Sequence, residues 1–136
     1  MDYLKLENQL CFPLYAAARK VVKMYGPYLS KIGLTYTQYI AMMVLWEEKT
    51  VNVRELGRKL RLDSGTLSPL LKRLEEQGYC ERRRLDADER VVEINITKKG
   101  MDLKKRASEI PEQMRKCLDL SLDEATTLYG LLYKIV

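Results

Sequence analysis

The segment that decides the fold is residues Asp63–Thr97, which reads DSGTLSPLLKRLEEQGYCERRRLDADERVVEINIT. Its first half has the marks of a helix, because Asp63 or Ser64 can cap the first turn and Gly78 suits the left-handed residue at the end. Four residues recur at helical spacing as one apolar stripe: Leu67, Leu70, Leu71 and Leu74. After Gly78 the apolar period changes to two, so we expect a β-hairpin directly after the helix.

The opposite face of this helix is polar and basic. It carries small hydroxyl groups and cations, namely Ser64, Thr66, Ser68, Lys72 and Arg73. Small hydroxyls let a helix approach base edges closely, and cations reach phosphates or guanine. The pattern therefore predicts a helix that enters a groove of double-stranded DNA. Pro69 lacks the N–H that would bond to Gly65, so we expect it to bend the first turn.

The tip of the predicted hairpin, residues 82–90, is a run of charges. It contains four arginines and three acids: Arg82, Arg83, Arg84, Arg90, Asp86, Asp88 and Glu89. We interpret Arg82, Arg84, Asp88 and Arg90 as DNA-binding, with Asp88 holding a neighbouring guanidinium and Arg90 entering a narrow A·T minor groove. A charge run is otherwise a solvated turn, but the preceding helix favours a DNA-binding wing.

Composition limits the function. A chain of 136 residues is one domain, and its net charge of +5 comes with basic residues clustered between Arg54 and Arg90, which favours a polyanion partner. The absence of histidine excludes Ser-His-Asp and Cys-His catalysis, and three separated cysteines argue against a disulfide scaffold or a thiolate zinc site. We expect no cofactor, no metal and no enzymatic activity. No apolar run spans a membrane and no signal peptide is visible, so we expect a cytoplasmic protein.

Capping motifs place the other helices. Thr35-x-x-Gln38 opens an apolar central helix that runs to Glu48, and Asn52-x-x-Glu55 opens a short helix that turns at Leu62 into the DNA-binding helix. The first helix extends from about Leu4 to Leu29 and closes at Gly26 and Pro27. Because of Pro13, its main part begins near Phe12, with Leu4 to Leu10 a separate turn. After the hairpin, Thr97 caps a helix that Pro111 interrupts, and Ser121-x-x-Glu124 opens the last one.

The two ends of the chain carry apolar stripes that a small domain cannot bury. The last helix has Leu128, Leu131, Leu132 and Ile135 on one face. We expect residues 1–34 and 98–136 to form dimerisation helices around a winged helix-turn-helix at 35–97, with its wing at 79–97. The expected fold is mainly α with a small β-wing. A two-fold homodimer places its DNA-binding helices one DNA turn apart or a multiple of it, which predicts a pseudo-palindromic operator.

Several stretches resemble the MarR family of winged helix-turn-helix repressors. These are DSGTLSPLLKRLEEQGY, DADER and VVEINIT, with an Asp-x-Arg wing core at Asp88, Glu89 and Arg90. Nearer the start, LENQLCFPLYAAARKVV and LTYTQYIAMMVLWE are similar to the organic-hydroperoxide-sensing OhrR and SarZ branch. The resemblance implies a bacterial, DNA-binding transcriptional repressor that an oxidant releases from its operator. Pro13 departs from the family, which has an aliphatic residue there.

Cys11 is the candidate redox-sensing residue. We expect it at a helix N-terminus, where the partial positive charge favours the thiolate that attacks a peroxide oxygen. Tyr15 lies one turn along on the same face, and by the resemblance Tyr25 and Tyr36 correspond to tyrosines that hydrogen-bond the reactive cysteine. Each of these residues alone is also an ordinary packing residue. The combination favours oxidation of Cys11 by an organic hydroperoxide as the signal.

The other cysteines leave alternatives open. In some members of the resembled family a second cysteine near the chain's end resolves the oxidised one across the dimer, which makes Cys117 a possible resolving residue. The spacing fits Cys117 equally well as a core residue, in which case a small cellular thiol would form the disulfide with Cys11. Cys80 is interpreted as structural. Two rival functions are a MarR-type regulator that binds a small aromatic ligand and a thiol peroxidase. A thiol peroxidase would have no evident use for the predicted wing.

Overall fold

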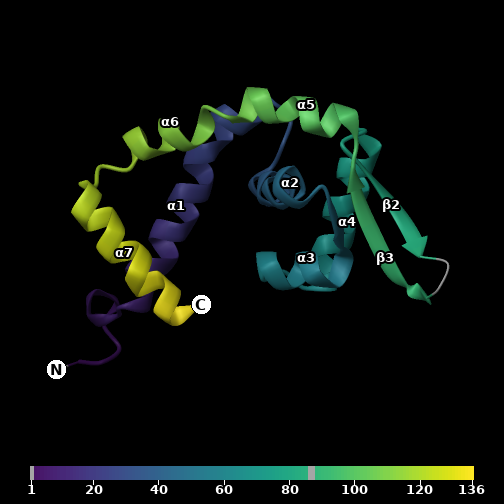
Figure 1. Ribbon diagram of the computed structural model, residues 1–136. Coiled ribbons are helices and arrows are strands. Elements are labelled where there is room, and N and C mark those ends of the chain that lie inside the picture. The colour runs from purple at the N-terminus through teal and green to yellow at the C-terminus, as the bar shows by residue number, and fades with distance from the viewer. Residues whose placement is uncertain (1, 86–87) are drawn as a thin grey trace.

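The computed structural model of the chain describes residues 2–85 and 88–136, and for residues 88 and 89 it describes the backbone alone. The role predicted for the Asp88 side chain therefore lies outside the described residues. Figure 1 shows the elements in this order: η1 Leu6–Asn8, α1 Cys11–Ser30, α2 Tyr36–Glu48, β1 Thr50–Asn52, α3 Val53–Leu60, α4 Ser64–Glu76, β2 Cys80–Leu85, β3 Asp88–Ile96, α5 Lys98–Ala107, α6 Ile110–Cys117 and α7 Leu122–Ile135. The predicted class, mainly α with a small β-wing, is confirmed.

The core lies where α2, α3 and α4 pack against the sheet, and we call these elements with β1, β2 and β3 the winged lobe. The stripe predicted for α4 is buried in full, and α2 contributes Met42 and Leu45 with no exposed surface. From the sheet, Ile94 of β3 is fully buried and packs into the same cluster. Because close packing of large aliphatic side chains resists rearrangement, this core holds α4 in a fixed orientation.

The sheet has one strand more than the sequence predicted. Its order is β1-β3-β2 and both pairs are antiparallel, with Val51 opposite Ile94 and Cys80 opposite Ile96. We did not predict β1, because three residues are too few to show an alternating period. Its partner is β3, more than 40 residues further along the chain, and Val51 is buried against it.

The capping predictions are confirmed by hydrogen bonds. Thr35 and Gln38 form a reciprocal capping box at the start of α2, and Ser121 and Glu124 form another at α7. Asp63 accepts from the Thr66 N–H at 2.7 Å, and Thr97 accepts from Gly100. At α3 only half of the expected pattern is present, because Asn52 caps the helix while the Glu55 carboxylate binds Arg58 instead.

The first helix ends within one residue of the predicted Leu29, but the predicted closure at Gly26 and Pro27 is wrong. Helix α1 begins at Cys11 and continues through Gly26 and Pro27 to Ser30. It ends in a turn in which Gly33 has φ +70° and the Leu34 N–H donates to Leu29 at 3.1 Å. Proline costs a helix one hydrogen bond, but burial of Leu29, Ile32 and Leu34 in the core outweighs that loss.

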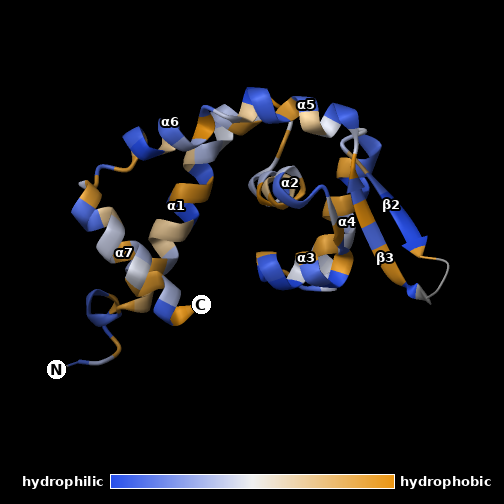
Figure 2. Ribbon diagram, in the orientation of Figure 1, coloured by the Kyte–Doolittle hydropathy of each residue, from blue (hydrophilic) through white to orange (hydrophobic). Residues whose placement is uncertain are grey.

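Helices α1, α6 and α7 form a helical arm that extends away from the winged lobe (Figure 1). Figure 2 shows apolar segments along α1 and α7, and α7 contributes no buried residue to the described chain. Its predicted stripe is open to solvent, with Leu128, Leu131 and Ile135 exposed by 44%, 52% and 68%. Among the described helices, none is both long and apolar enough to cross a membrane.

Candidate nucleic-acid interface and thiol sites

Helix α4 presents the polar face that the sequence predicted. Ser64, Thr66, Ser68, Lys72 and Arg73 are all exposed, while the leucines on the other side are buried. Asp63 caps the helix through the Thr66 N–H, and that backbone hydrogen bond holds the pKa of the Asp63 carboxyl below its usual value. The helix is continuous from Ser64 to Glu76 in spite of Pro69, and the bend expected there stays a prediction.

The turn between α3 and α4 brings the start of α4 close to α3. Arg61 adopts the left-handed conformation, with φ +55°, and the Leu62 N–H returns to the Gly57 carbonyl at 3.0 Å. A Cβ at position 57 would meet the Leu62 carbonyl oxygen at 3.0 Å and the Leu67 side chain at 3.4 Å. Glycine at this position therefore allows the tight helix-turn-helix angle.

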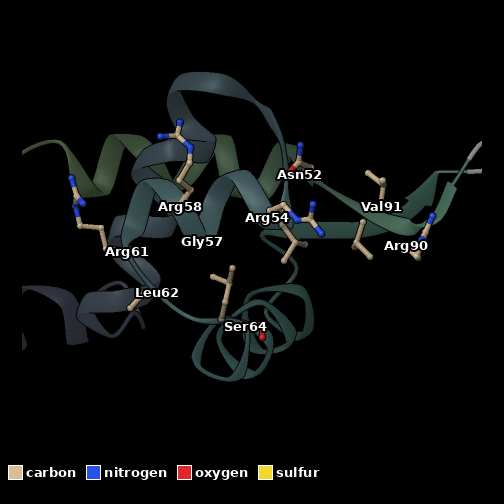
Figure 3. A pocket seen from close by; sticks show the side chains of 12 residues that line it. Asn52, Arg54, Gly57, Arg58, Arg61, Leu62, Ser64, Arg90 and Val91 are labelled. Atoms are coloured by element: carbon tan, nitrogen blue, oxygen red, sulfur yellow. The ribbon is translucent and has the colours of Figure 1, made fainter.

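A basic groove lies between α3, the start of α4 and β3, with a volume of about 860 Å³ (Figure 3). Four arginines line it, three from α3 and its end and one from the wing: Arg54, Arg58, Arg61 and Arg90. Arg58 is held by Glu55, with its Nε 3.0 Å from the carboxylate. Sequence reasoning missed the α3 arginines as individual residues. Arg54, Arg58 and Arg61 are four and three residues apart, which places all three on one helical face. That spacing is the signal by which they could have been predicted.

The wing arginines have different surroundings. The Arg82 N–H donates to Glu75 at 2.8 Å, and the two side chains form an ion pair at 3.2 Å, so Arg82 connects β2 to the end of α4. Arg84 and Arg90 are exposed, and each has an interaction within the chain. The side chain of Asp88, predicted to orient a neighbouring guanidinium, lies outside the described residues. The structure therefore distinguishes Arg82 as a residue of the lobe's framework.

Cys11 occupies the first position of α1, as predicted. Its thiol is exposed, and Leu10 before it supplies no side-chain hydrogen bond to the helix N-terminus. Tyr15 lies on the next turn, where its hydroxyl accepts from Arg19 at 3.3 Å and the guanidinium lies 5.4 Å from the ring centroid. The Cys11 thiol is therefore accessible from solvent.

Tyr25 and Tyr36 form an aromatic cluster with Tyr39, away from Cys11. The rings of Tyr25 and Tyr36 are 4.9 Å apart, and burial raises the pKa of Tyr25 above its usual value. Fourteen residues of continuous helix separate Cys11 from Tyr25, which corresponds to an axial rise of about 21 Å. Within one subunit the structure brings Cys11 near Tyr15 but not near Tyr25 and Tyr36.

The remaining cysteines differ in burial. Cys117 is the last residue of α6 and is exposed, and its sulfur lies 3.4 Å from the hydroxyl of Tyr28 on α1. That hydrogen bond raises the pKa of the Tyr28 phenol. Cys80 is buried, and the loss of solvent raises the pKa of its thiol to about 11. In the part of the chain that the structure describes, no group of three or more acidic or cysteine side chains could hold a metal ion.

The fold and the basic surface define a winged helix-turn-helix protein, since a polar helix after a tight turn is followed by a two-stranded wing. A family model described as transcriptional regulator SarA/Rot matches residues 23–107. The chain belongs to this family of MarR-type winged-helix transcriptional regulators, in the branch of the OhrR and SarZ proteins.

Two similar transcriptional regulators support this assignment. The organic hydroperoxide resistance transcriptional regulator of Bacillus subtilis is 45% identical, over 99% of this chain and 92% of its own length. The regulator SarZ of Staphylococcus haemolyticus is 42% identical, over 96% of this chain and 89% of its own. The predicted resemblance to the MarR family and to its OhrR and SarZ branch is thereby confirmed.

Solved structures of one protein, AbfR of Staphylococcus epidermidis, are similar in three states. Reduced AbfR bound to DNA is 32% identical with a TM-score of 0.85, over 99% of this chain and 92% of that one. Overoxidized AbfR bound to DNA is 35% identical with a TM-score of 0.79, over 96% of this chain and 91% of that one. Disulfide-formed AbfR is 35% identical with a TM-score of 0.64, over 94% of this chain and 86% of that one. Among these three AbfR structures, the TM-score is therefore highest for the reduced, DNA-bound form.

Proposed function

We propose that this regulator is a homodimeric repressor that binds a pseudo-palindromic operator in the bacterial cytoplasm and releases it when an organic hydroperoxide oxidises Cys11. The observation that carries the proposal is the exposed Cys11 thiol at the N-terminus of α1, in a chain whose α4 and wing form a basic surface. The relative from Bacillus subtilis, described as an organic hydroperoxide resistance regulator, supports the choice of oxidant.

On DNA, α4 enters the major groove with its exposed hydroxyls and cations toward the base edges. The arginines of α3 bind phosphates beside the groove, which fixes the position of the protein without reading sequence. Arg90 and Arg84 lie on the wing and reach the minor groove, where narrow A·T tracts attract guanidinium groups. Arg82 serves DNA binding indirectly, because Glu75 holds it against the end of α4.

The dimer forms through the helical arm. Exposed apolar residues on α1 and α7 leave an apolar surface that a second copy can cover. Since Cys11 is about four helical turns from Tyr25 in its own subunit, a contact between the thiol and the Tyr25–Tyr36 pair requires the partner subunit. Tyr15 is the one predicted phenol that lies next to Cys11 on the same helix.

An organic hydroperoxide oxidises Cys11 in two steps, first to a sulfenic acid and then to a disulfide. The Cys11 thiolate attacks one peroxide oxygen, the O–O bond breaks, and the alkoxide takes a proton and leaves as an alcohol. The sulfur loses two electrons and becomes a sulfenic acid. A second thiol then attacks this sulfur, a disulfide forms, and the hydroxyl leaves as water. The second thiol is Cys117 of the partner subunit or a small cellular thiol.

The AbfR structures favour the disulfide as the step that releases DNA. Both reduced and overoxidized AbfR have been solved bound to DNA, so in that protein overoxidation alone is compatible with binding. We therefore assign release in this regulator to a disulfide at Cys11, which constrains α1 more than a sulfenic acid does. The exposed position of Cys117 at the end of α6 supports such a role.

The test begins with selection of a duplex from random DNA by the reduced protein. We expect a selected sequence with two-fold symmetry, release of the wild type by cumene hydroperoxide, and continued binding of Cys11→Ser under the same treatment. Equal release of wild type and Cys11→Ser would exclude Cys11 as the trigger. A covalent dimer on a non-reducing gel, absent from both Cys11→Ser and Cys117→Ser, identifies Cys117 as the resolving thiol. Release of Cys117→Ser only when free cysteine is added identifies a small thiol.

A further inference from the structure

The C-terminal end of α4 meets the end of α1 at a pair of similar turns. Each helix closes with a glycine in the left-handed conformation, Gly33 with φ +70° after α1 and Gly78 with φ +83° after α4. In each turn the next N–H returns five residues, from Leu34 to Leu29 at 3.1 Å and from Tyr79 to Leu74 at 3.0 Å. Both turns are therefore rigid ends of their helices.

One side chain joins the two turns. The Gln77 amide nitrogen donates to the Gly33 carbonyl oxygen at 2.8 Å, across 44 residues of sequence. The amide oxygen of the same side chain is buried, and among the described residues it has no hydrogen-bond partner. Leaving a buried oxygen unpaired is unfavourable, so the bond through the nitrogen is the one favourable polar contact that this amide makes there.

The main chain of Gln77 is bound from the other side. Its carbonyl oxygen accepts from the Lys99 ammonium at 2.7 Å, and the Lys99 nitrogen lies 5.1 Å from the Tyr79 ring centroid. Lys99 lies in the first turn of α5, the helix that leads to α6 and α7. Gln77 thus contacts the turn after α1 through its side chain and contacts α5 through its backbone carbonyl. It lies directly at the C-terminal end of α4, the DNA-binding helix.

We propose that Gln77 is the positioning residue that transmits movement of α1 to α4, an inference that rests on the proposed function. Helix α1 is a lever of about 30 Å with Cys11 at its first residue and the Gln77-bound turn just beyond its last. A disulfide that tilts α1 moves the Gly33 carbonyl, and the hydrogen bond pulls the end of α4 with it. A rigid dimer that matches DNA at two half-sites loses affinity when its helices tilt.

The test replaces Gln77 with methionine, which has similar length and no hydrogen-bond donor. Because Gln77→Met also removes the unpaired buried oxygen, we expect it to fold with a Tm at or above that of the wild type. Its Kd for the selected duplex in the reduced state should stay within about twofold of the wild type. The ratio of oxidised to reduced Kd should fall about tenfold, within the range of coupling between sites. Gln77→Leu repeats the test if the methionine variant does not fold.

Lys99→Met is the matched control, since it cuts the α5 connection and leaves the Gln77 side chain in place. Lys99→Met should keep the wild-type ratio of oxidised to reduced Kd. An unchanged ratio in Gln77→Met, an equal loss in Lys99→Met, or a collapse of reduced binding in Gln77→Met would each overturn the assignment. If the wild type itself keeps its DNA after oxidation, the proposed function fails before Gln77 is tested, so the two failures are distinguishable.

Discussion

At the scale of single residues, the three cysteines fall into two classes by burial. Cys11 and Cys117 are exposed, whereas Cys80 is 1% exposed and the pKa of its thiol is raised to about 11 by burial. Thiolate is the reactive form, so a buried thiol with a high pKa reacts slowly. This difference in exposure and pKa distinguishes the buried Cys80 thiol from the two exposed thiols more clearly than sequence context did.

We expect a thiol-reactive dye at pH 8 to label two cysteines per native chain and three per chain in denaturant. Mass analysis of the native sample should find Cys80 unlabelled, because it remains almost entirely thiol three pH units below its pKa. Rapid labelling of Cys80 in the folded protein would contradict its structural role. Cys80→Ala, which keeps a small residue in the core, should leave the two fast sites unchanged.

The arginines of α3 give a second prediction at this scale. If Arg54 and Arg61 bind phosphates, replacing either by alanine should reduce the slope of log K against log salt by about 0.9 per subunit, or about 1.8 per dimer. The selected DNA sequence should not change, because phosphate contacts carry no sequence information. Fluorescence anisotropy between 50 and 300 mM salt, roughly the range where the slope is linear, measures this. An altered selected sequence would instead assign these arginines to base contacts.

The role of a single residue could be predicted where its partners are close in the sequence, and could not where they are far apart. Cys11 at a helix start and the hydroxyl face of α4 follow from neighbours a few residues apart. The bond between Gln77 and Gly33 joins residues 44 positions apart, and the pair of Tyr28 and Cys117 joins residues 89 apart. No periodicity or motif brings such partners together, since tertiary packing alone decides them.

At the scale of elements, the same distinction explains which helix ends were predicted correctly. Caps at Thr35, Asp63 and Ser121 involve a side chain and an N–H three residues away, so the sequence contains both partners. Gly26 and Pro27 were predicted to close α1, but the helix continues to Ser30 because residues beyond the proline are buried. Strand β1 exists through pairing with β3, which local sequence does not encode.

The connection between α4 and β2 predicts a dependence on pH. The Arg82 backbone N–H, with help from its guanidinium, holds the pKa of Glu75 below its usual value. A carboxyl whose pKa is lower in the folded chain stabilises the fold above its unfolded value of about 4.5. That contribution is lost as the pH falls through the lower, folded value.

Glu75→Gln should therefore be less stable than the wild type at pH 7, and the difference should shrink as the pH falls from about 5 toward 3. Thermal unfolding at a series of pH values measures it. Glu112→Gln is the control, because the Glu112 carboxyl also has a lowered pKa but pairs with Arg115 on an exposed turn of α6. A pH-independent difference between wild type and Glu75→Gln would show that the pair does not stabilise the fold through charge.

At the scale of the whole molecule, the chain has a buried winged lobe and a helical arm whose apolar face is open. Leu128 and Leu131 on α7 are exposed, and α7 buries none of its own residues in the described chain. Exposed apolar surface of this kind is characteristic of an interface. Dimerisation is thus expected to cover the apolar face of the arm, whose α1 and α6 also contribute Leu29, Ile110 and Met114 to the core.

Leu131→Glu should weaken the dimer, because it places a charge in the apolar stripe of α7. Sedimentation at micromolar concentration should show a shift toward monomer and a corresponding loss of DNA affinity, since each half-site is then bound alone. Thr126→Glu on the opposite face of α7 is the control and should remain dimeric. A Leu131→Glu protein that sediments as the wild type does would place the interface elsewhere.

The central claim is that a disulfide at Cys11 releases DNA, and one titration tests it most directly. Cumene hydroperoxide is added in steps to the reduced protein on its selected duplex, with free cysteine present. The fraction of DNA bound and the mass of the Cys11 peptide are measured in the same samples. We predict that release rises in step with the fraction of Cys11 found in a disulfide. Complete release with Cys11 still a thiol, or full retention of DNA with every Cys11 in a disulfide, would contradict the claim.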